Sequence, residues 1–510
     1  MSSSSKPEDL ARNVIELCSN CDECRRSMED TPCLFFPRLF QLHDREKEKD
    51  KKITSDELRK LIDLCNMCGL CTCFTVRADI REAKDAFIAR DGLKPAIRIL
   101  EDVQRVGKIC GAFPRLANLL SEITPVANLA KQLAGIHPKR KLPKLPPESF
   151  DAWARKRNLH QKRETTGPKV AYFAGCTARY LFPEVAKATV EVLERNGVTV
   201  YFPEQKCCGM PSLLEGDRPF TFDLANYNLQ QLEDAVDDGY DIVCSCPTCG
   251  YMLKGVLSEG AYLSKEYREI LKKMMTEAGG DQNKVLERIL EEEANPQGRA
   301  TPASPRRSKP PLPVMLIIRG YLQDEGYFAS IDGLKRIKIA SHSYDAGEYL
   351  RELDRRGNFN RALGPVRDRM AYYAPCHLKE QNMGQPWAEL LGFVPEISME
   401  NVGGVFDCCG ISGIMGFKKE FHAVSLAMGS RLMEKIKVIN PETLVSDCLS
   451  CRIQFNQELS YPVLHPVEVL NQAYRLGCET SCESGHQSAG RGSGCKSGSE
   501  SECQAVSKSR

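Results

Sequence analysis

Cysteine is the residue type in this sequence whose number and spacing point to chemistry. The chain has 24 cysteines in 510 residues, and it is far too long to be a small scaffold held together by disulfides. Its first residues contain no apolar stretch of the length that a secretory signal needs, so we expect the chain to stay in the reducing cytoplasm. Thiolates remain available there, and we expect them to bind metal clusters.

Two runs of cysteines near the start of the chain have the spacing of iron–sulfur ligands. Each run has three cysteines separated by two residues, which provides three ligands of a cubane cluster, and in two-cluster ferredoxins a fourth cysteine comes from the other run. The predicted ligands are Cys18, Cys21, Cys24, Cys33, Cys65, Cys68, Cys71 and Cys73. By that logic Cys33 joins the second run and Cys73 joins the first. Neither cysteine has the usual spacing of three residues after the third cysteine of a run, and in the second run Thr75 stands at that position. The identity of the fourth ligand of each cluster therefore stays open.

A second set of cysteines occurs twice, about two hundred residues apart. The first copy has Cys176, Cys207, Cys208, Cys246 and Cys249, and the second has Cys376, Cys408, Cys409, Cys448 and Cys451. The offset stays between 200 and 202 residues at all five positions, which indicates a duplicated domain. Five thiols exceed the four ligands of a tetrahedral zinc ion, and two adjacent cysteines can serve different irons of one larger cluster.

Short strands and helices are predicted to position these cysteines. Apolar runs rich in β-branched or aromatic residues lead into the cysteines of both copies, at residues 170–173, 241–243, 371–373 and 443–445. A helix is predicted over 183–196 and the next strand over 198–202. Strand–helix–strand order favours a parallel α/β sheet, whose carboxyl edge is where such sheets bind ligands. We therefore expect the cysteines of each copy to meet at that edge.

The doubled motif also carries a resemblance to a known family. The segments GCTARY, KCCGMP and SCPTCG, with PCHLKE, DCCGISGIMGFKKE and DCLSCR in the second copy, resemble the paired CCG domains of heterodisulfide reductase subunits and of the C subunit of anaerobic glycerol-3-phosphate dehydrogenase. The resemblance implies a multi-domain α plus α/β chain, in which an N-terminal α-helical ferredoxin domain is followed by two duplicated α/β CCG domains. It covers nearly all of the chain outside the linker and the C-terminal tail.

The same resemblance implies cofactors and roles for the cysteines. The N-terminal domain would hold two [4Fe–4S] clusters, and the CCG domains one or two noncubane iron–sulfur clusters, with zinc as the alternative in one copy. The first-copy cysteines would bind a cofactor. The second-copy cysteines would form the catalytic end, because that copy has the fuller resemblance.

Changes in composition suggest where the units begin and end. Residues 279–313 are rich in proline and charge, and the last part of the chain is rich in serine, glycine and lysine. The predicted units are a ferredoxin-like domain with two clusters at 1–92, a helical connector at 93–147, a first CCG domain at 168–275, a linker or insertion at 276–313, a second CCG domain with a preceding helical segment at 314–475 and a disordered tail at 476–510. Each unit is expected to have its own core.

Several polar residues have a structural and a functional interpretation. His377 and His465 are suited to proton relay at a redox site, although packed histidines beside a strand are the favoured interpretation. Lys418 and Lys419 are suited to steering an anionic partner, although a solvated basic turn is favoured.

Residues 96–135 alternate apolar and basic residues at helical spacing. The pattern suits a helix lying on a membrane surface near quinone. It also suits packing against the cluster domain, which is the favoured interpretation. No window approaches the length of an apolar membrane span.

The remaining sequence features narrow the function. The net charge of +2 gives no reason to expect a nucleic acid partner. No Gly-x-Gly-x-x-Gly follows a predicted strand and no Walker loop occurs, so we expect neither flavin nor nicotinamide on this chain.

The predicted function is that of an iron–sulfur electron-transfer subunit, which connects a flavoprotein dehydrogenase or other redox subunit with a quinone or disulfide acceptor. It would be cytoplasmic or peripheral to the inner face of the cell membrane. The alternatives are a catalytic heterodisulfide reductase subunit and a non-redox zinc-binding scaffold, and the donor, the acceptor, the direction of electron flow and the oligomeric state stay open.

Overall fold

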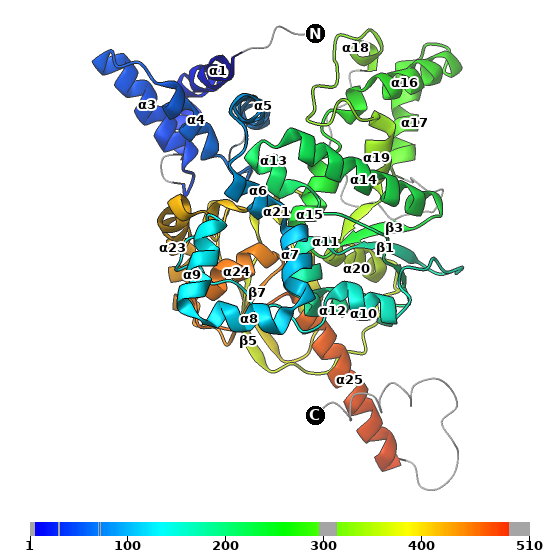
Figure 1. Ribbon diagram of the computed structural model, residues 1–510. Coiled ribbons are helices and arrows are strands. Elements are labelled where there is room, and N and C mark those ends of the chain that lie inside the picture. Colours follow the sequence, from blue (N-terminus) through cyan, green and yellow to red (C-terminus); the bar gives the residue numbers. More distant parts are fainter. Residues whose placement is uncertain (1–5, 29–30, 70, 72, 295–313, 489–510) are drawn as a thin grey trace.

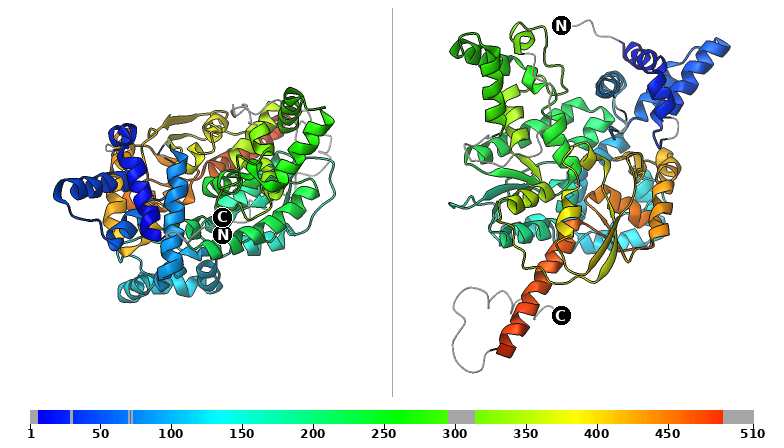
Figure 2. Two further views of the ribbon diagram at one scale, coloured as in Figure 1. Left: turned by 90° about the horizontal axis from the view of Figure 1, so that it is seen from above. Right: turned by 180° about the vertical axis from the view of Figure 1, so that it is seen from behind.

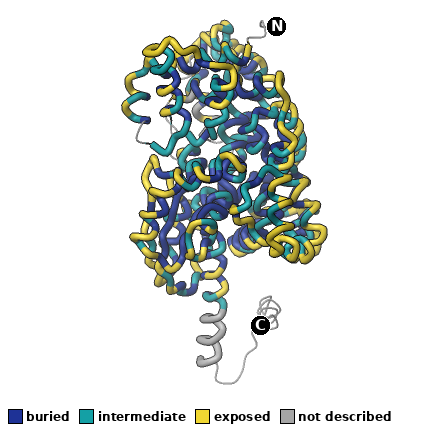
Figure 3. Tube along the Cα trace, turned by 60° about the vertical axis from the view of Figure 1, so that its left-hand side comes forward, coloured by how far each residue is buried: buried dark blue, intermediate teal, exposed yellow. Residues whose placement is uncertain are grey.

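The computed structural model describes residues 6–28, 31–69, 71, 73–294 and 314–488. A group of N-terminal helices lies beside two small parallel sheets, and further helices cover the sheets (Figures 1 and 2). Buried residues are concentrated in the interior and exposed residues at the rim (Figure 3). The chain thus combines one helical unit with two α/β units.

The N-terminal unit is a bundle of helices. It consists of α1 (Pro7–Ser19), α2 (Asp22–Met28), α3 (Phe35–Lys49), α4 (Ser55–Asp63) and α5 (Phe74–Asp91). Apolar residues one turn apart on α1, Ala11 and Val14, are buried where this helix packs against α4 and α5. The start of α4 is fixed by a capping box between Thr54 and Glu57. The unit is helical as expected, and its assignment as a ferredoxin domain stays a prediction.

The first sheet carries the first set of repeated cysteines. Its strands are β1 (Lys169–Phe173), β2 (Thr199–Tyr201), β3 (Asp241–Cys244) and β4 (Ser343–Asp345), all parallel, in the order β2-β1-β3-β4. Its helices are α11 (Gly175–Tyr180), α12 (Pro183–Arg195), α13 (Met210–Glu215), α14 (Arg218–Asp237), α15 (Pro247–Tyr251), α16 (Lys265–Glu277), α17 (Gln282–Ala294), α18 (Val314–Ile318) and α19 (Gly333–Ser341). The predicted strands at 170–173, 198–202 and 241–243 are present.

The second sheet repeats the topology of the first. Its strands are β5 (Asp368–Tyr373), β6 (Ile397–Asn401), β7 (Thr443–Ser446) and β8 (Val463–Leu464), all parallel, in the equivalent order β6-β5-β7-β8. Its helices are α20 (Ala346–Arg355), α21 (Cys376–Lys379), α22 (Pro386–Leu391), α23 (His422–Ile439), α24 (Leu449–Glu458) and α25 (Pro466–Ser488). Equal strand orders support the duplication that the cysteine offset predicts.

A connector of short helices joins the N-terminal bundle to the first sheet. It contains α6 (Pro95–Glu101), α7 (Val103–Ala112), α8 (Pro114–Glu122), α9 (Thr124–Leu133) and α10 (Phe150–Lys156). Helix α7 packs against α11, and Gly107 lies against the ring of Tyr180 so closely that a side chain would not fit there. Helices α8 and α9 bury no residue at all. The favoured expectation that this stretch packs against the cluster domain is therefore wrong for α8 and α9.

Some predicted boundaries differ from the structure. Strand β4 belongs to the first sheet, where Ser343 pairs with Ile242, although its position in the sequence predicts the second domain. Helix α17 lies within the predicted linker because its Val285 and Ile289 pack into an apolar cluster with α16 and α18. Helix α25 continues to Ser488, beyond the predicted start of the disordered tail. Residues 295–313 and 489–510 lie outside the described residues.

The units share their cores, contrary to expectation. One cluster of buried apolar residues runs from Leu39 and Leu61 of the N-terminal bundle to Leu213 and Ile242 of the first α/β unit. A second cluster contains residues of both α/β units, and α12 of the first packs against α25 of the second. The three units are therefore continuous at the level of side-chain packing.

Candidate metal centres

The five thiols of the first copy lie at the carboxyl ends of β1 and β3. Cys176 is on α11, Cys246 precedes α15 and Cys249 is within it, and all five are buried. The Sγ atoms of Cys176 and Cys207 are 3.6 Å apart. Gly175 has a φ of +69°, and a Cβ there would stand 2.7 Å from the Sγ of Cys249. Glycine is thus required for the chain to turn past these thiols.

The thiols of the second copy occupy the equivalent edge of the second sheet. Cys376 begins α21, Cys448 precedes α24, and Cys451 donates its backbone N–H to the Sγ of Cys448 at 3.5 Å. The copies differ in exposure, because Cys376 and Cys408 are only partly buried. Two residues of the second set are therefore partly exposed, whereas the pKa of both of their thiols is still raised, by burial for Cys376 and by the hydrogen bond with Cys409 and burial for Cys408.

The Cys-Cys-Gly sequence has the same backbone geometry in both copies. Gly209 and Gly410 have φ values of +91° and +89°, in the left-handed region that favours glycine. A Cβ on Gly410 would lie 2.1 Å from the carbonyl oxygen of Ser425 and 2.8 Å from the backbone nitrogen of Gly429, which are both on α23. The glycine of the second copy lets the paired cysteines pass close to a helix, which explains why glycine follows them there.

The second cysteine of each adjacent pair is the more acidic one. A hydrogen bond from Cys207, helped by one from Cys249, lowers the pKa of Cys208 to about 6 despite burial. In the second copy, hydrogen bonds from Cys408 and Cys451 hold the pKa of Cys409 well below its usual range. Since the thiolate is the metal ligand, each copy has a buried cysteine at the same position whose ionised form is favoured by hydrogen bonds from neighbouring thiols.

The N-terminal thiols form two neighbouring groups. Burial, followed by the charges of Cys24, Cys73, Cys71 and Cys21, raises the pKa of Cys18 to about 12, so these thiols lie near one another. The other group, Cys33, Cys65, Cys68 and Cys71, lines a single hollow. Cys33 thus lies with the second run and Cys73 near the first, as the crossed arrangement requires. Their roles as ligands stay predictions.

The hollow beside the second run reaches the second α/β copy. It is a small hollow of about 30 Å³, and Cys408 and Met428 of the second copy line it together with the N-terminal thiols. Asn66 Nδ2 donates to Ser412 Oγ at 2.6 Å across this boundary. The charge of Cys68 contributes to raising the pKa of Cys408, after its hydrogen bond with Cys409 and burial. The N-terminal set and the second-copy set are therefore direct neighbours.

The two α/β copies also meet through residues beside their thiols. Thr248, between Cys246 and Cys249, is hydrogen-bonded to Nδ1 of His377 at 2.9 Å, and the His377 ring stacks on Tyr251. Burial lowers the pKa of His377 to about 4, so it is neutral near pH 7. His465 is fully buried, with Nε2 at 3.1 Å from the carbonyl oxygen of Ser245. Both histidines have the packed surroundings that the sequence interpretation favoured.

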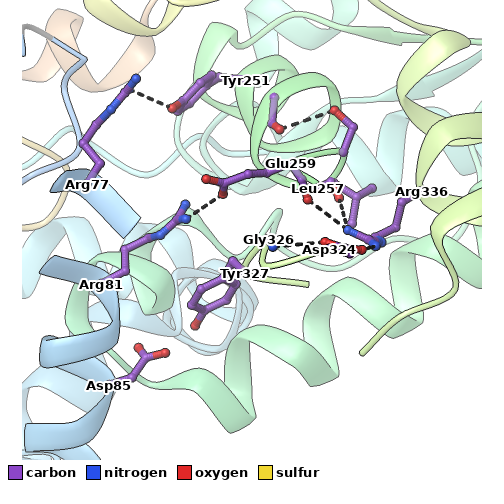
Figure 4. Close-up of polar contacts among 12 residues, drawn as sticks. Arg77, Arg81, Asp85, Tyr251, Leu257, Glu259, Asp324, Gly326, Tyr327 and Arg336 are labelled. Atoms are coloured by element: carbon purple, nitrogen blue, oxygen red, sulfur yellow. Dashed lines mark hydrogen bonds and ion pairs between the residues drawn. The ribbon is translucent and has the colours of Figure 1, made fainter. Parts of the chain in front are cut away.

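Ion pairs from α5 hold the N-terminal bundle against both copies. Arg77 pairs with Glu380 of the second copy at 2.6 Å. Figure 4 shows the contacts with the first copy, where Arg77 donates to the Tyr251 hydroxyl at 3.3 Å. Arg81 pairs with Glu259 of the first copy at 2.6 Å. Glu380 also lies so close to Gly69 in the cysteine loop that no side chain would fit there.

Two buried lysines were not identified as structural residues from the sequence. Lys84 on α5 donates to the carbonyl oxygens of Cys65 at 3.1 Å and Leu214 at 2.7 Å, which fixes the second cysteine run. Lys418 is buried and pairs with Glu215 at 2.6 Å, so the interpretation of a solvated basic turn is wrong for it. Their partners lie far away in the sequence, and helical or strand periodicity carries no signal of such contacts.

The donor sets fit iron–sulfur clusters. Each α/β copy offers five soft thiol ligands at a sheet edge. Hydrogen bonds lower the pKa of Cys208 and Cys246 in the first copy and of Cys409 in the second. Within the described residues, no three His, Cys, Asp or Glu side chains converge closely enough to hold a single metal ion. The first copy has a further small cavity of about 10 Å³ beside Cys208, lined by apolar residues such as Leu229 and Met252.

Comparison with known proteins identifies the repeated unit. Residues 170–254 and 370–456 each match the cysteine-rich CCG domain, so the chain contains two CCG domains, as the sequence motif predicts. Over 387 residues the chain is 24% identical to the C subunit of the anaerobic glycerol-3-phosphate dehydrogenase of Escherichia coli K12, covering 75% of this chain and 78% of that protein.

Two further relatives have related names. The B subunit of the fumarate reductase (CoM/CoB) of Methanothermobacter marburgensis is 23% identical over 311 residues, covering 60% of this chain and 46% of that protein. An uncharacterized iron-sulfur protein of Methanococcus maripaludis is 31% identical over 107 residues, covering 21% of each chain. These similarities support an iron–sulfur protein with an electron-transfer role in an oxidoreductase. Within the described residues, no helix has both the length and the apolar character needed to cross a bilayer.

Proposed function

We propose that this chain is the iron–sulfur electron-transfer subunit of a multi-subunit oxidoreductase, and that it relays electrons between a flavoprotein dehydrogenase and a quinone or disulfide acceptor. The observation that carries the proposal is the hollow in which the thiols of the second N-terminal run face Cys408 of the second CCG domain. Such contact offers a short path between two redox sites. The names of the dehydrogenase and reductase relatives support the same role.

The cysteines would hold the cofactors in three places. Two [4Fe–4S] clusters would be bound by the N-terminal thiols, in the crossed arrangement that joins Cys33 to the second run and Cys73 to the first. Noncubane clusters would be bound by the five thiols of each CCG domain, with zinc as the alternative in one. Bound clusters supply one-electron redox chemistry. The protein supplies buried thiolates, glycine turns that let the chain pass close to them, and ion pairs that keep the three sites in contact.

The second CCG domain is the proposed end at which the acceptor reacts. Cys376 and Cys408 are partly exposed there, whereas all five thiols of the first CCG domain are buried. Val405 and Phe406, just before the cysteine pair, are exposed apolar residues that suit an apolar acceptor such as a quinone. The same accessibility favours the second candidate, a catalytic heterodisulfide reductase in which this domain acts directly on a disulfide.

A peripheral position on the inner face of the cell membrane is part of the proposal. Helices α8 and α9 bury no residue, and the connector presents many large apolar side chains to solvent: Ile109, Phe113, Leu116, Leu119, Leu120, Ile123, Val126, Leu129 and Leu133. Residues 103–146 contain eight lysines and arginines and a single acidic residue, in a chain with a net charge of only +2. Apolar side chains on basic helices are the combination that binds anionic lipid surfaces.

Metal analysis of the native complex tests the cofactor assignment. Protein purified anaerobically should carry more iron and acid-labile sulfide than two [4Fe–4S] clusters contain, because the CCG domains add ten thiols. Iron at or below the content of two such clusters, with zinc in the rest, would overturn the cluster-bearing CCG domains.

Copurification separates the two candidate functions. A flavoprotein dehydrogenase in the native complex supports the electron-transfer subunit. Turnover of a thiol heterodisulfide by this chain alone would instead support the catalytic reductase.

A further inference from the structure

A short strap of the connector, residues 135–141, runs along the second CCG domain just after its cysteine pair. Ile136 forms an antiparallel β-bridge with Lys418, and Lys419 donates its backbone N–H to the carbonyl oxygen of Gly135 at 2.8 Å. The strap continues to Lys141, whose backbone N–H donates to Oε1 of Gln457 at 2.7 Å. Through these contacts the connector places one side chain, Arg140, inside the second CCG domain.

The guanidinium of Arg140 is completely buried and lacks an acidic partner. It donates to Oε1 of Gln454 at 2.6 Å, to Oγ of Ser425 at 3.2 Å and to the carbonyl oxygen of Gly416. All three acceptors are neutral, and among the described residues no carboxylate lies within ion-pair distance of Arg140. Burial lowers its pKa, and the negative groups that oppose this effect are Glu458 and the Cys409 thiol. A buried cation is costly without a nearby anion. Ser425, which accepts a hydrogen bond from Arg140, donates in turn to the carbonyl oxygen of Gly410 beside Cys409, so the guanidinium lies one side chain away from the thiolate site, with Glu458 as the other negative group.

The first CCG domain has no such arrangement. The register of the paired cysteines Cys249 and Cys451 aligns Gln454 with Met252. The structure agrees with this alignment. In the first domain the Met252 methyl group would lie 3.5 Å from a Cβ on Gly209, and in the second domain Gln454 donates to the carbonyl oxygen of Ser425, which lies against Gly410. The first domain thus has an apolar side chain where the second holds the amide that anchors the guanidinium.

We propose that Arg140 is a buried positive counter-charge of the second CCG site and raises its reduction potential above that of the first CCG site. The inference rests on the proposed function, since it presumes an iron–sulfur cluster in each CCG domain. A nearby cation favours the state with one more negative charge, and its effect is strong in a buried, low-dielectric position. The electron comes from the N-terminal site through the contact at Cys68 and Cys408, and Arg140 keeps its protons throughout. The charge directs electrons into the second CCG domain, where the acceptor has access.

A redox titration of the full chain with its clusters tests this role. The signal of the second CCG site is identified in electron paramagnetic resonance as the one that Cys409→Ser removes. In Arg140→Met, we expect normal iron content. At a fixed potential, the ratio of reduced to oxidised second CCG site should be at least tenfold lower than in the wild type, and this tenfold change corresponds to a 59 mV lower reduction potential for a one-electron couple. Arg140→Lys should restore most of the ratio, because it keeps the charge. Gln454→Met, which copies the first domain, should shift the ratio in the same direction by less.

A second buried arginine provides the matched control. Arg179 lies beside the first CCG site, but Asp151 pairs with it at 2.8 Å, so Arg179→Met should leave the second-site potential unchanged. An unshifted potential in both Arg140→Met and Gln454→Met at full iron content would overturn the inference. An equal shift in Arg140→Lys and Arg140→Met would also overturn it, because packing rather than charge would then be the cause. Wild-type protein without iron in the CCG domains would overturn the proposed function itself, and this inference with it.

Discussion

The exposed apolar side chains of α8 and α9 allow a quantitative test of membrane binding. Leu119, Leu129 and Leu133 are 58%, 59% and 72% exposed, so most of their surface is free to enter a lipid interface. Complete burial of a leucine contributes roughly 1.5–3 kcal/mol, and transfer of somewhat more than half of each side chain is worth about 1 kcal/mol. Replacing all three with glutamine should cost about 3 kcal/mol, which weakens binding about a hundredfold.

Flotation with vesicles that contain anionic lipid measures this partition. The matched control is Val438→Gln, because Val438 is 86% exposed and belongs to α23 rather than to the basic connector. We expect the control to float like the wild type and the triple variant to stay with the free protein. Added salt should weaken binding of the wild type, because the basic residues of the connector contribute through charge. Equal flotation of triple variant and wild type would refute the membrane assignment, and the apolar face would then belong to a protein partner.

Three further outcomes are expected. Cys68→Ser should abolish partner-driven reduction of the second CCG site while chemical reductants still reduce it, and unchanged partner-driven transfer would refute the route through the hollow. Cys409→Ser should lose more acceptor reduction than Cys208→Ser, with little change in circular dichroism, and full iron loading with normal acceptor reduction would contradict the assignment of the reactive end. Burial raises the pKa of Asp345 to about 7. Between about pH 4 and pH 7 the folded chain therefore keeps a proton on this carboxyl that the unfolded chain releases. The contribution of Asp345 to the free energy of unfolding thus falls as pH rises through this range. In Asp345→Asn, which keeps a capping side chain on α20, urea midpoints should fall less between pH 5 and pH 7, and an unchanged slope would contradict the shift.

The sequence predicted those parts of the fold that local pattern determines. Strands β1 and β5 each contain a short apolar run that ends shortly before a cysteine. Their burial in parallel sheets follows from that pattern. The duplicated topology followed from the cysteine register. Strand β4 was assigned to the wrong unit because it has only three residues, and the helices of the α16–α19 segment separate it from β3 in the sequence.

The residues that surround the thiols could not be predicted in the same way. Arg140 has partners at Gly416, Ser425 and Gln454, each more than 270 residues away along the chain. Lys84 binds carbonyl oxygens, which carry no sequence signal at all. Such contacts depend on how the units pack, and one sequence without its relatives holds no record of that. The cysteine spacing therefore located the sites, but not the charges beside them.

The continuous core has a consequence for cooperativity. Because the same apolar cluster includes residues of the N-terminal bundle and of the first CCG domain, neither can lose its packing without exposing the other. The second cluster joins the two CCG domains in the same way. Unfolding of one unit is thus expected to destabilise the unit that shares its cluster. Oxidative damage at one redox site would then also weaken the folding of its neighbour.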